Sequence, residues 1–269
     1  MTDNMKVYIS VDMEGICGVT KWHETNRGEA DYEYFRALMT REASAAVEGA
    51  LAAGASEVVV RDAHDSGCNI LPDELHPEAR LIRNWSGGLL SMMEGLDATY
   101  SAAVFIGYHA KANTRNAILK HTMSLSIADL RVNGVSLPEA GWNALIAGMF
   151  QVPVVFVSGD EALCQQASTL LGHVDTLAVK AAIGAASVNR SPAWARENIS
   201  LGVKKALLSL GDFKPFDLGS PCEVEIEFRE EEGAERGSWY PGARRLNNTT
   251  VTLTAINFMD ALRFYHFVG

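Results

Sequence analysis

The stretch Lys6–Val11 (KVYISV), which runs directly into residues 12–15 (DMEG), sets the fold class of this chain. Its apolar and β-branched residues are typical of a strand that is buried on both faces, as in a parallel sheet. Side chains two positions apart on a strand project to the same side. We therefore expect the carboxylates of Asp12 and Glu14 to converge at the end of this strand.

A strand–helix–strand unit is predicted for residues 6–60. Apolar residues recur on one face of the middle segment, which is typical of an amphipathic helix, and Gly54 stands where a glycine commonly follows a helix. The predicted apolar face consists of Phe35, Met39, Ala43, Ala46, Val47 and Ala50. Residues 57–60 (EVVV) predict the second strand. Such a unit is expected to be a right-handed crossover between parallel strands.

The rest of the chain extends this pattern and then changes character. Strands are predicted at 80–84, 102–107, 152–158 and 174–179, and helices at 89–96, 138–149, 161–171 and 191–210. Asn133-Gly134 predicts a hairpin in residues 123–135. After residues 212–220, which contain Gly, Pro and Asp, two alternating strands are predicted at 222–228 and 249–255 and a helix at 257–267. We expect an α/β fold, a mostly parallel central sheet flanked by helices, with a smaller α+β C-terminal portion at 212–269.

Composition excludes several classes of protein. The 269 residues carry 23 Lys+Arg and 33 Asp+Glu, which gives a formal net charge of −10. This acidic balance, without a basic stripe, argues against nucleic acid as a partner. No apolar run approaches the ~18 residues that a membrane-spanning helix needs. We therefore expect no nucleic-acid partner and no membrane partner.

The N-terminus and the cysteines favour a cytoplasmic location. The chain does not start with the basic segment and apolar run of a secretory signal. Cys17, Cys68, Cys164 and Cys222 are scattered and include no Cys-x-x-Cys pair. This pattern suits reduced thiols better than a disulfide framework.

Groups that can bind metals follow the predicted strands. Asp12 and Glu14 follow the first strand, His64 lies at the end of the second in RDAHD, and His109 follows a third in GYHA. In open α/β sheets, ligands bind outside the carboxyl ends of the strands. Imidazoles and carboxylates at one edge suit Zn²⁺, and less selectively Mn²⁺ or Co²⁺.

Each of these residues also has a purely structural explanation. Asp12 and Glu14 could cap a loop, His64 could be a surface imidazole in an acidic loop, and His109 could be a hydrogen-bonded core histidine. Unrelated caps and core residues have no reason to follow three successive strands. We therefore favour one shared site.

Two more residues could complete this site. His121 lies in a polar stretch before the predicted hairpin, and Glu139 opens a predicted helix, where a carboxylate also complements the helix dipole. The sequence has no Gly-rich phosphate loop, no G-x-S-x-G and no H-E-x-x-H. A metal site is therefore the best-supported chemistry.

Six segments in a fixed order give the chain a family resemblance. They are residues 5–19 (MKVYISVDMEGICGV), 57–70 (EVVVRDAHDSGCNI), 74–82 (ELHPEARLI), 92–97 (MMEGLD), 105–110 (FIGYHA) and 138–148 (PEAGWNALIAG). Together they resemble the D-aminopeptidase DppA family (peptidase family M55) over about residues 5–200. The resemblance is specific because no short pattern produces six ordered segments.

The resemblance implies a zinc-dependent aminopeptidase with two Zn²⁺ per chain. The family's metal ligands match Asp12, Glu14, His64, His109 and Glu139, with Asp12 bridging the two ions. The family's catalytic histidine matches His121 and is described there as a nucleophile. We favour a water activated by the two metals, with His121 as proton carrier or stabiliser of the oxyanion.

The resemblance also implies a substrate and an assembly. We expect release of small N-terminal residues, of D configuration such as D-Ala, from short peptides or amides. The change in composition at residues 212–220 makes residues 1–211 the expected metal-binding catalytic domain. The resemblance implies a homodecamer of stacked pentamer rings. The same metallohydrolase site could instead act on L-configured or γ-glutamyl dipeptides. A non-catalytic metal- or small-molecule-binding protein is the alternative from another class.

Overall fold

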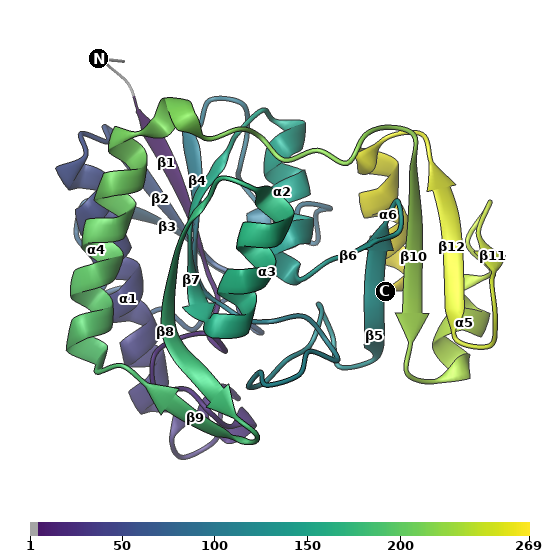
Figure 1. Cartoon of the computed structure of the whole chain (residues 1–269), viewed down its shortest axis with the longest axis horizontal. Helices are drawn as coiled ribbons and strands as arrows, with labels where there is room; N and C mark the ends of the chain where they lie inside the picture. The colour runs from purple at the N-terminus through teal and green to yellow at the C-terminus, as the bar shows by residue number, and fades with distance from the viewer. Residues whose placement is uncertain (1–4) are drawn as a thin grey trace.

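A seven-stranded sheet forms the larger part of the computed structural model, which describes residues 5–269 (Figure 1). Its strands lie in the order β3-β2-β1-β4-β7-β8-β9. All neighbours are parallel except β9, which is antiparallel to β8. The strands are β1 (Lys6–Val11), β2 (Glu57–Asp62), β3 (Ala79–Ile82), β4 (Ala102–Tyr108), β7 (Val154–Asp160), β8 (Asp175–Ile183) and β9 (Ala186–Asn189).

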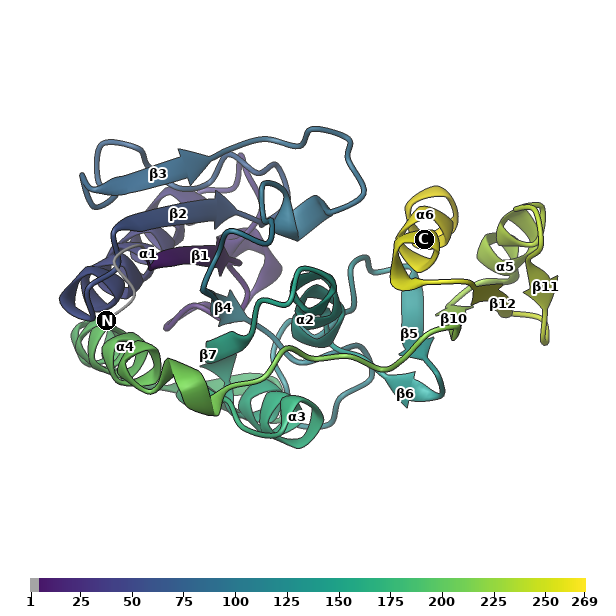
Figure 2. The same cartoon turned by 90° about the horizontal axis from the view of Figure 1, so that it is seen from above.

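Helices cover both faces of this sheet (Figure 2). α1 (Tyr32–Ala52) and α4 (Pro192–Leu208) pack against each other on one face, and α2 (Glu139–Met149) and α3 (Glu161–Leu171) lie on the other. Strand β1 shows why the sequence allows this. Val7 and Ile9 pack in the core beneath α1 and α4, whereas Tyr8 packs in the core beneath α2. Both sides of the strand are buried, as its unbroken apolar sequence predicts.

A second, antiparallel sheet packs beyond α2. Its five strands lie in the order β11-β12-β10-β5-β6. They are β5 (Ile127–Val132), β6 (Val135–Ser136), β10 (Cys222–Phe228), β11 (Arg244–Arg245) and β12 (Thr250–Ala255), accompanied by α5 (Glu231–Gly237) and α6 (Phe258–Val268). In β10, buried residues alternate with more exposed ones. This alternation matches a sheet that has one face on the core and one toward solvent.

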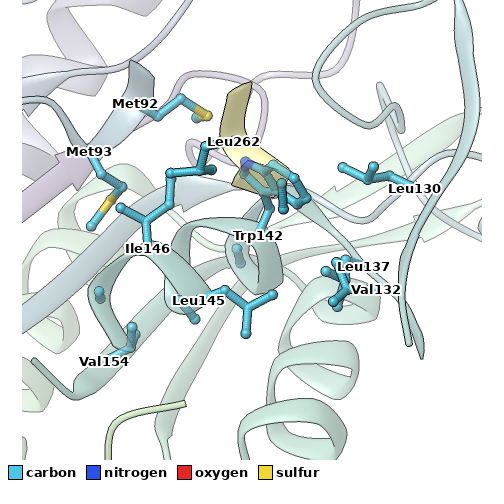
Figure 3. Packing of buried hydrophobic residues seen from close by; sticks show 14 of the residues in the cluster. Met92, Met93, Leu130, Val132, Leu137, Trp142, Leu145, Ile146, Val154 and Leu262 are labelled. Carbon is cyan, nitrogen blue, oxygen red and sulfur yellow. The ribbon is translucent and has the colours of Figure 1, made fainter. Parts of the chain in front are cut away.

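One apolar core joins the two sheets through α2 (Figure 3). Trp142 and Leu145 of α2 are in the same cluster as Met92, as Leu130 of the second sheet and as Leu262 of α6. Trp142 also packs against Phe258 with ring centroids 4.9 Å apart. Full burial of an aromatic or aliphatic side chain of this size contributes about 1.5–3 kcal/mol. Helix α2 is therefore held in place by packing against both the large sheet's side and the second sheet's side of this core.

The fold class predicted from the sequence is confirmed, and local differences have physical causes. The hairpin predicted at 123–135 forms as β5 and β6, but it pairs with β10 in the second sheet. Residues 89–96 form only the single 3₁₀ turn Ser91–Met93, because Ser91 has a φ of 49°, which is outside the range of a right-handed helix. Strand β9, helix α5 and strand β11 were not predicted from the sequence.

The division of the chain at residue 211 stays a prediction. The second sheet takes β5 and β6 from ahead of that point, so each sheet is built from more than one stretch of chain. Within residues 5–269, no helix combines the length and the apolar character needed to cross a membrane.

Candidate metal centre

The six candidate residues meet at one edge of the large sheet. Strands β2, β1 and β4 are neighbours, so His64, Asp12 with Glu14, and His109 follow three adjacent strand ends. The other two arrive from different directions: Glu139 is the first residue of α2, and His121 lies in the loop before β5. The structure therefore brings together the residues that the sequence singled out. All except the half-buried His121 are at most 6% exposed.

Asp12 lies between two imidazoles. Its Oδ1 is 3.3 Å from Nδ1 of His64, and its Oδ2 is 3.4 Å from Nε2 of His109. Glu14 joins the first side, with Oε2 3.1 Å from Nδ1 of His64. The two carboxylate oxygens of Asp12 thus face two separate histidines.

The second side contains Glu139 and two stacked histidines. Oε1 of Glu139 is 3.4 Å from Nε2 of His109 and 3.5 Å from Nε2 of His121. The two imidazole rings are nearly parallel, with centroids 4.1 Å apart. His109, His121 and Glu139 lie close enough together to share one ion, and so do Asp12, Glu14 and His109.

Backbone carbonyls fix which nitrogen of each histidine carries its proton. Nε2 of His64 is hydrogen-bonded to the carbonyl of Thr25 at 3.0 Å, and Nδ1 of His109 is hydrogen-bonded to the carbonyl of Ala110 at 3.0 Å. Nδ1 of His121 is hydrogen-bonded to the carbonyl of Leu119 at 2.9 Å. A carbonyl only accepts hydrogen bonds, so each of these nitrogens is the donor. The other nitrogen of each neutral ring presents a lone pair to the carboxylates, which is the arrangement of metal-ligating histidines.

The resulting charge distribution attracts positive charge. Asp12 Oδ2, Glu14 Oε2 and His109 Nε2 are buried and have no hydrogen-bond partner within residues 5–269. Burial, followed by the neighbouring Glu14 carboxylate, raises the pKa of Asp12 to about 7. Burial alone would lower the pKa of His109, but the carboxylates of Glu139, Asp12 and Glu14 raise it to about 10. The donor set of imidazoles and carboxylates fits Zn²⁺, which would supply this charge.

A buried lysine holds the loop that carries Glu14. Lys180 of β8 donates from Nζ to the backbone carbonyls of Glu14, of Ile16 at 3.1 Å and of Val19 at 2.6 Å. Burial lowers the pKa of Lys180 to about 8. No sequence pattern predicts a role for Lys180, because only the position of β8 beside the loop reveals its partners.

Glu42 of α1 also holds this loop. Its Oε1 accepts a hydrogen bond from the backbone N–H of Cys17 at 2.9 Å, and its Oε2 has no partner within residues 5–269. Burial raises the pKa of Glu42 to about 7, while the Cys17 N–H and the cations of Lys180 and Arg196 oppose the shift. No sequence pattern indicates a role for this residue, since glutamates are common on helices.

A cavity of about 550 Å³ opens over the candidate metal residues. Its walls include Trp22, Trp85, Met92, Leu125 and, from α6, Tyr265. Trp22 packs edge-on against His121 at 5.4 Å, and Arg61 lies 4.4 Å from the ring of Trp85. No Lys or Arg of residues 5–269 is among the lining residues, whereas Asp65 joins the acidic ones. The cavity therefore favours a cationic end of a ligand.

Comparisons with known proteins find relatives that match nearly the whole chain. The family model described as D-aminopeptidase, peptidase family M55, matches residues 5–267. A D-aminopeptidase of Bacillus subtilis (strain 168) is 36% identical over 261 residues, which are 96% of this chain and 94% of that protein. The structure of a Zn-dependent D-aminopeptidase, DppA from Bacillus subtilis, has a TM-score of 0.93 and 35% identity. The match covers 97% of this chain and 95% of the DppA chain, which is described as a self-compartmentalizing protease.

Replacement of Glu42 by Gln is expected to remove part of the pH dependence of stability. The pKa of Glu42 is raised from 4.5 to about 7 in the folded protein, so its contribution is present below pH 4.5 and is lost as the pH rises through 7. The variant should gain stability relative to the wild type between pH 5 and 8, by up to roughly 3 kcal/mol.

Urea unfolding in the presence of a chelator measures this difference. Glu48→Gln, on the exposed face of the same helix, is the matched control and should leave the pH profile unchanged. Parallel profiles for wild type and Glu42→Gln would contradict a raised pKa at this position.

Proposed function

Because the chain belongs to the D-aminopeptidase family, peptidase family M55, and is therefore a hydrolase of the metallo-aminopeptidase class, we propose that it is zinc-dependent. We propose that it releases small N-terminal residues from short peptides or amides. We propose further that these residues have the D configuration, as in D-Ala. The relatives named for this activity cover nearly the whole chain. The proposed role of the protein is therefore the hydrolysis of short peptides in the cytoplasm.

The observation that carries the proposal is the position of Asp12 between His64 and His109. With one oxygen directed at each imidazole, Asp12 is suited to bridge two ions. Glu14 and His64 would complete one site, and His109 and Glu139 the other. When bound, zinc supplies Lewis acidity: it polarises a carbonyl group and lowers the pKa of water toward about 7. Two zinc ions per chain is part of the proposal.

His121 is proposed to carry the proton. Its Nδ1 is engaged by the Leu119 carbonyl, which leaves Nε2 with a lone pair next to Glu139. That nitrogen can accept a proton and later deliver it to the leaving amine. We favour this role over covalent attack by the imidazole. Its stacking on His109 also makes a metal-ligand role the alternative for His121.

The acidic character of the cavity supports a preference for a free N-terminus. Asp65 lines it and lies outside the proposed zinc ligands, so its carboxylate can attract an α-ammonium group and repel a terminal carboxylate. Amides and longer peptides without a nearby carboxylate should therefore bind at least as well as dipeptides. Action on L-configured or γ-glutamyl dipeptides is the rival that a substrate panel separates.

Wild-type protein loaded with zinc is expected to hydrolyse D-alanyl amide and D-Ala-D-Ala faster than their L enantiomers. Chelation should abolish hydrolysis and added Zn²⁺ should restore it, because zinc would supply the Lewis acidity that the reaction needs. Measured rates on D, L and γ-glutamyl substrates, with elemental analysis for zinc, test this. A zinc-loaded preparation that cleaves none of them would disprove an aminopeptidase.

Replacing the two stacked histidines should have different consequences. His109→Ala is expected to lower the zinc content, because Nε2 of His109 lies between Asp12 and Glu139. His121→Ala is expected to lower kcat by about 10²–10⁴-fold with near-normal zinc content, as for loss of a general acid–base group. Equal zinc loss in both variants would instead make His121 a ligand.

We also propose a homodecamer of stacked pentamer rings, because the related structure is described as self-compartmentalizing. Light scattering coupled to size exclusion should give a mass near ten times the 29.2 kDa of one chain. A stable monomer at micromolar concentration would contradict it.

A further inference from the structure

The C-terminal helix contributes a tyrosine to the cavity. Tyr265 of α6 lines the same cavity as Asp12, His121 and Glu139. Its ring packs against Trp142, with centroids 5.2 Å apart. Trp142 lies three positions after Glu139 on α2, and residues at this spacing share one helix face. The aromatic contact therefore holds Tyr265 on the Glu139 side of the cavity.

The hydroxyl group of Tyr265 does not contribute a hydrogen bond to the fold. It forms no hydrogen bond with any other residue of the described part of the chain, although the ring is packed into the core that joins the two sheets. A phenylalanine would provide the same packing without a polar group to hydrate. A hydroxyl placed here is thus free to bind a ligand.

The chemistry of the hydroxyl makes it a donor. Burial, followed by the Glu139 carboxylate, raises the pKa of Tyr265 far above its usual range, so the phenol stays protonated. His121 cannot serve in the same way while neutral, because its proton is on Nδ1 and directed to Leu119. The side of the cavity near Glu139 therefore has a neutral donor in Tyr265 and an acceptor in His121.

We propose that the Tyr265 hydroxyl donates a hydrogen bond to the carbonyl oxygen of the scissile amide and stabilises the negative charge that develops there. This inference rests on the proposed function, since it requires an amide substrate in the cavity. It also gives the C-terminal portion a direct part in the reaction. The step breaks no covalent bond: the phenolic proton stays on Tyr265 and strengthens its hydrogen bond as charge develops on the oxygen.

Tyr265→Phe tests the proposal because it removes one oxygen atom and keeps the ring that packs against Trp142. We expect kcat on D-alanyl amide to fall by about 10²-fold, the effect of removing one donor to an oxyanion, with KM, zinc content and Tm unchanged. The matched control is Tyr240→Phe, whose ring packs against Phe264 away from the cavity. It should keep wild-type kinetics.

A binding measurement separates this proposal from the proposed function. The phosphonic acid analogue of D-alanine carries anionic oxygens on a tetrahedral centre, and its affinity can be measured by calorimetry. Tyr265→Phe should bind it at least 10-fold more weakly than the wild type. Wild-type protein that cleaves no amide would refute the aminopeptidase, while the difference in affinity would still support the donor role.

Three results would overturn the proposal. The first is a Tyr265→Phe variant with kcat within twofold of the wild type. The second is a loss confined to KM, which would mean a contact of equal strength in the ground and transition states. The third is a parallel loss of zinc or of thermal stability, because the hydroxyl would then serve the structure of the site.

Discussion

The site depends on the balance between the repulsion among three buried carboxylates and the positive charge placed near them. Asp12, Glu14 and Glu139 converge at one sheet edge, where each is at most 3% exposed. Burial and mutual repulsion make this arrangement unfavourable unless positive charge lies among them. The lone pairs of His64 and His109 point at the same space, since backbone carbonyls hold the protons of both rings on the far side. Positive charge stabilises such a cluster, whether it comes from bound cations or from protons on the imidazoles, whose pKa values the carboxylates raise.

The surrounding fold keeps these groups in place. The parallel sheet aligns three strand ends side by side, so the residues that follow them share one edge. Lys180 and Glu42 then bind the polar backbone groups of the loop after β1. Gly15 allows this loop to pass close to β4: a Cβ there would lie 1.8 Å from the carbonyl oxygen of Tyr108. The position of Glu14 is thus set by contacts from β4, β8 and α1.

The second sheet completes the cavity. Helix α2 lies between the sheets, with Glu139 at its first turn and Trp142 in the shared core. Helix α6 packs on the other side of Trp142 and provides Tyr265 to the cavity wall. The core that stabilises the contact between the sheets therefore also sets the distance between the candidate metal residues and the far wall.

The amino-acid sequence alone determined the parts that depend on local pattern. The buried strand Lys6–Val11, the carboxylates two residues apart after it, and His64 and His109 after later strands could all be predicted, because strand periodicity and strand ends are visible in a short window of sequence. Tertiary structure alone decided the rest. β5 pairs with β10 across more than 80 residues of chain, and Lys180, Glu42 and Tyr265 reach the site from β8, α1 and α6. No local pattern encodes these contacts, because they depend on which surfaces the packed core brings together.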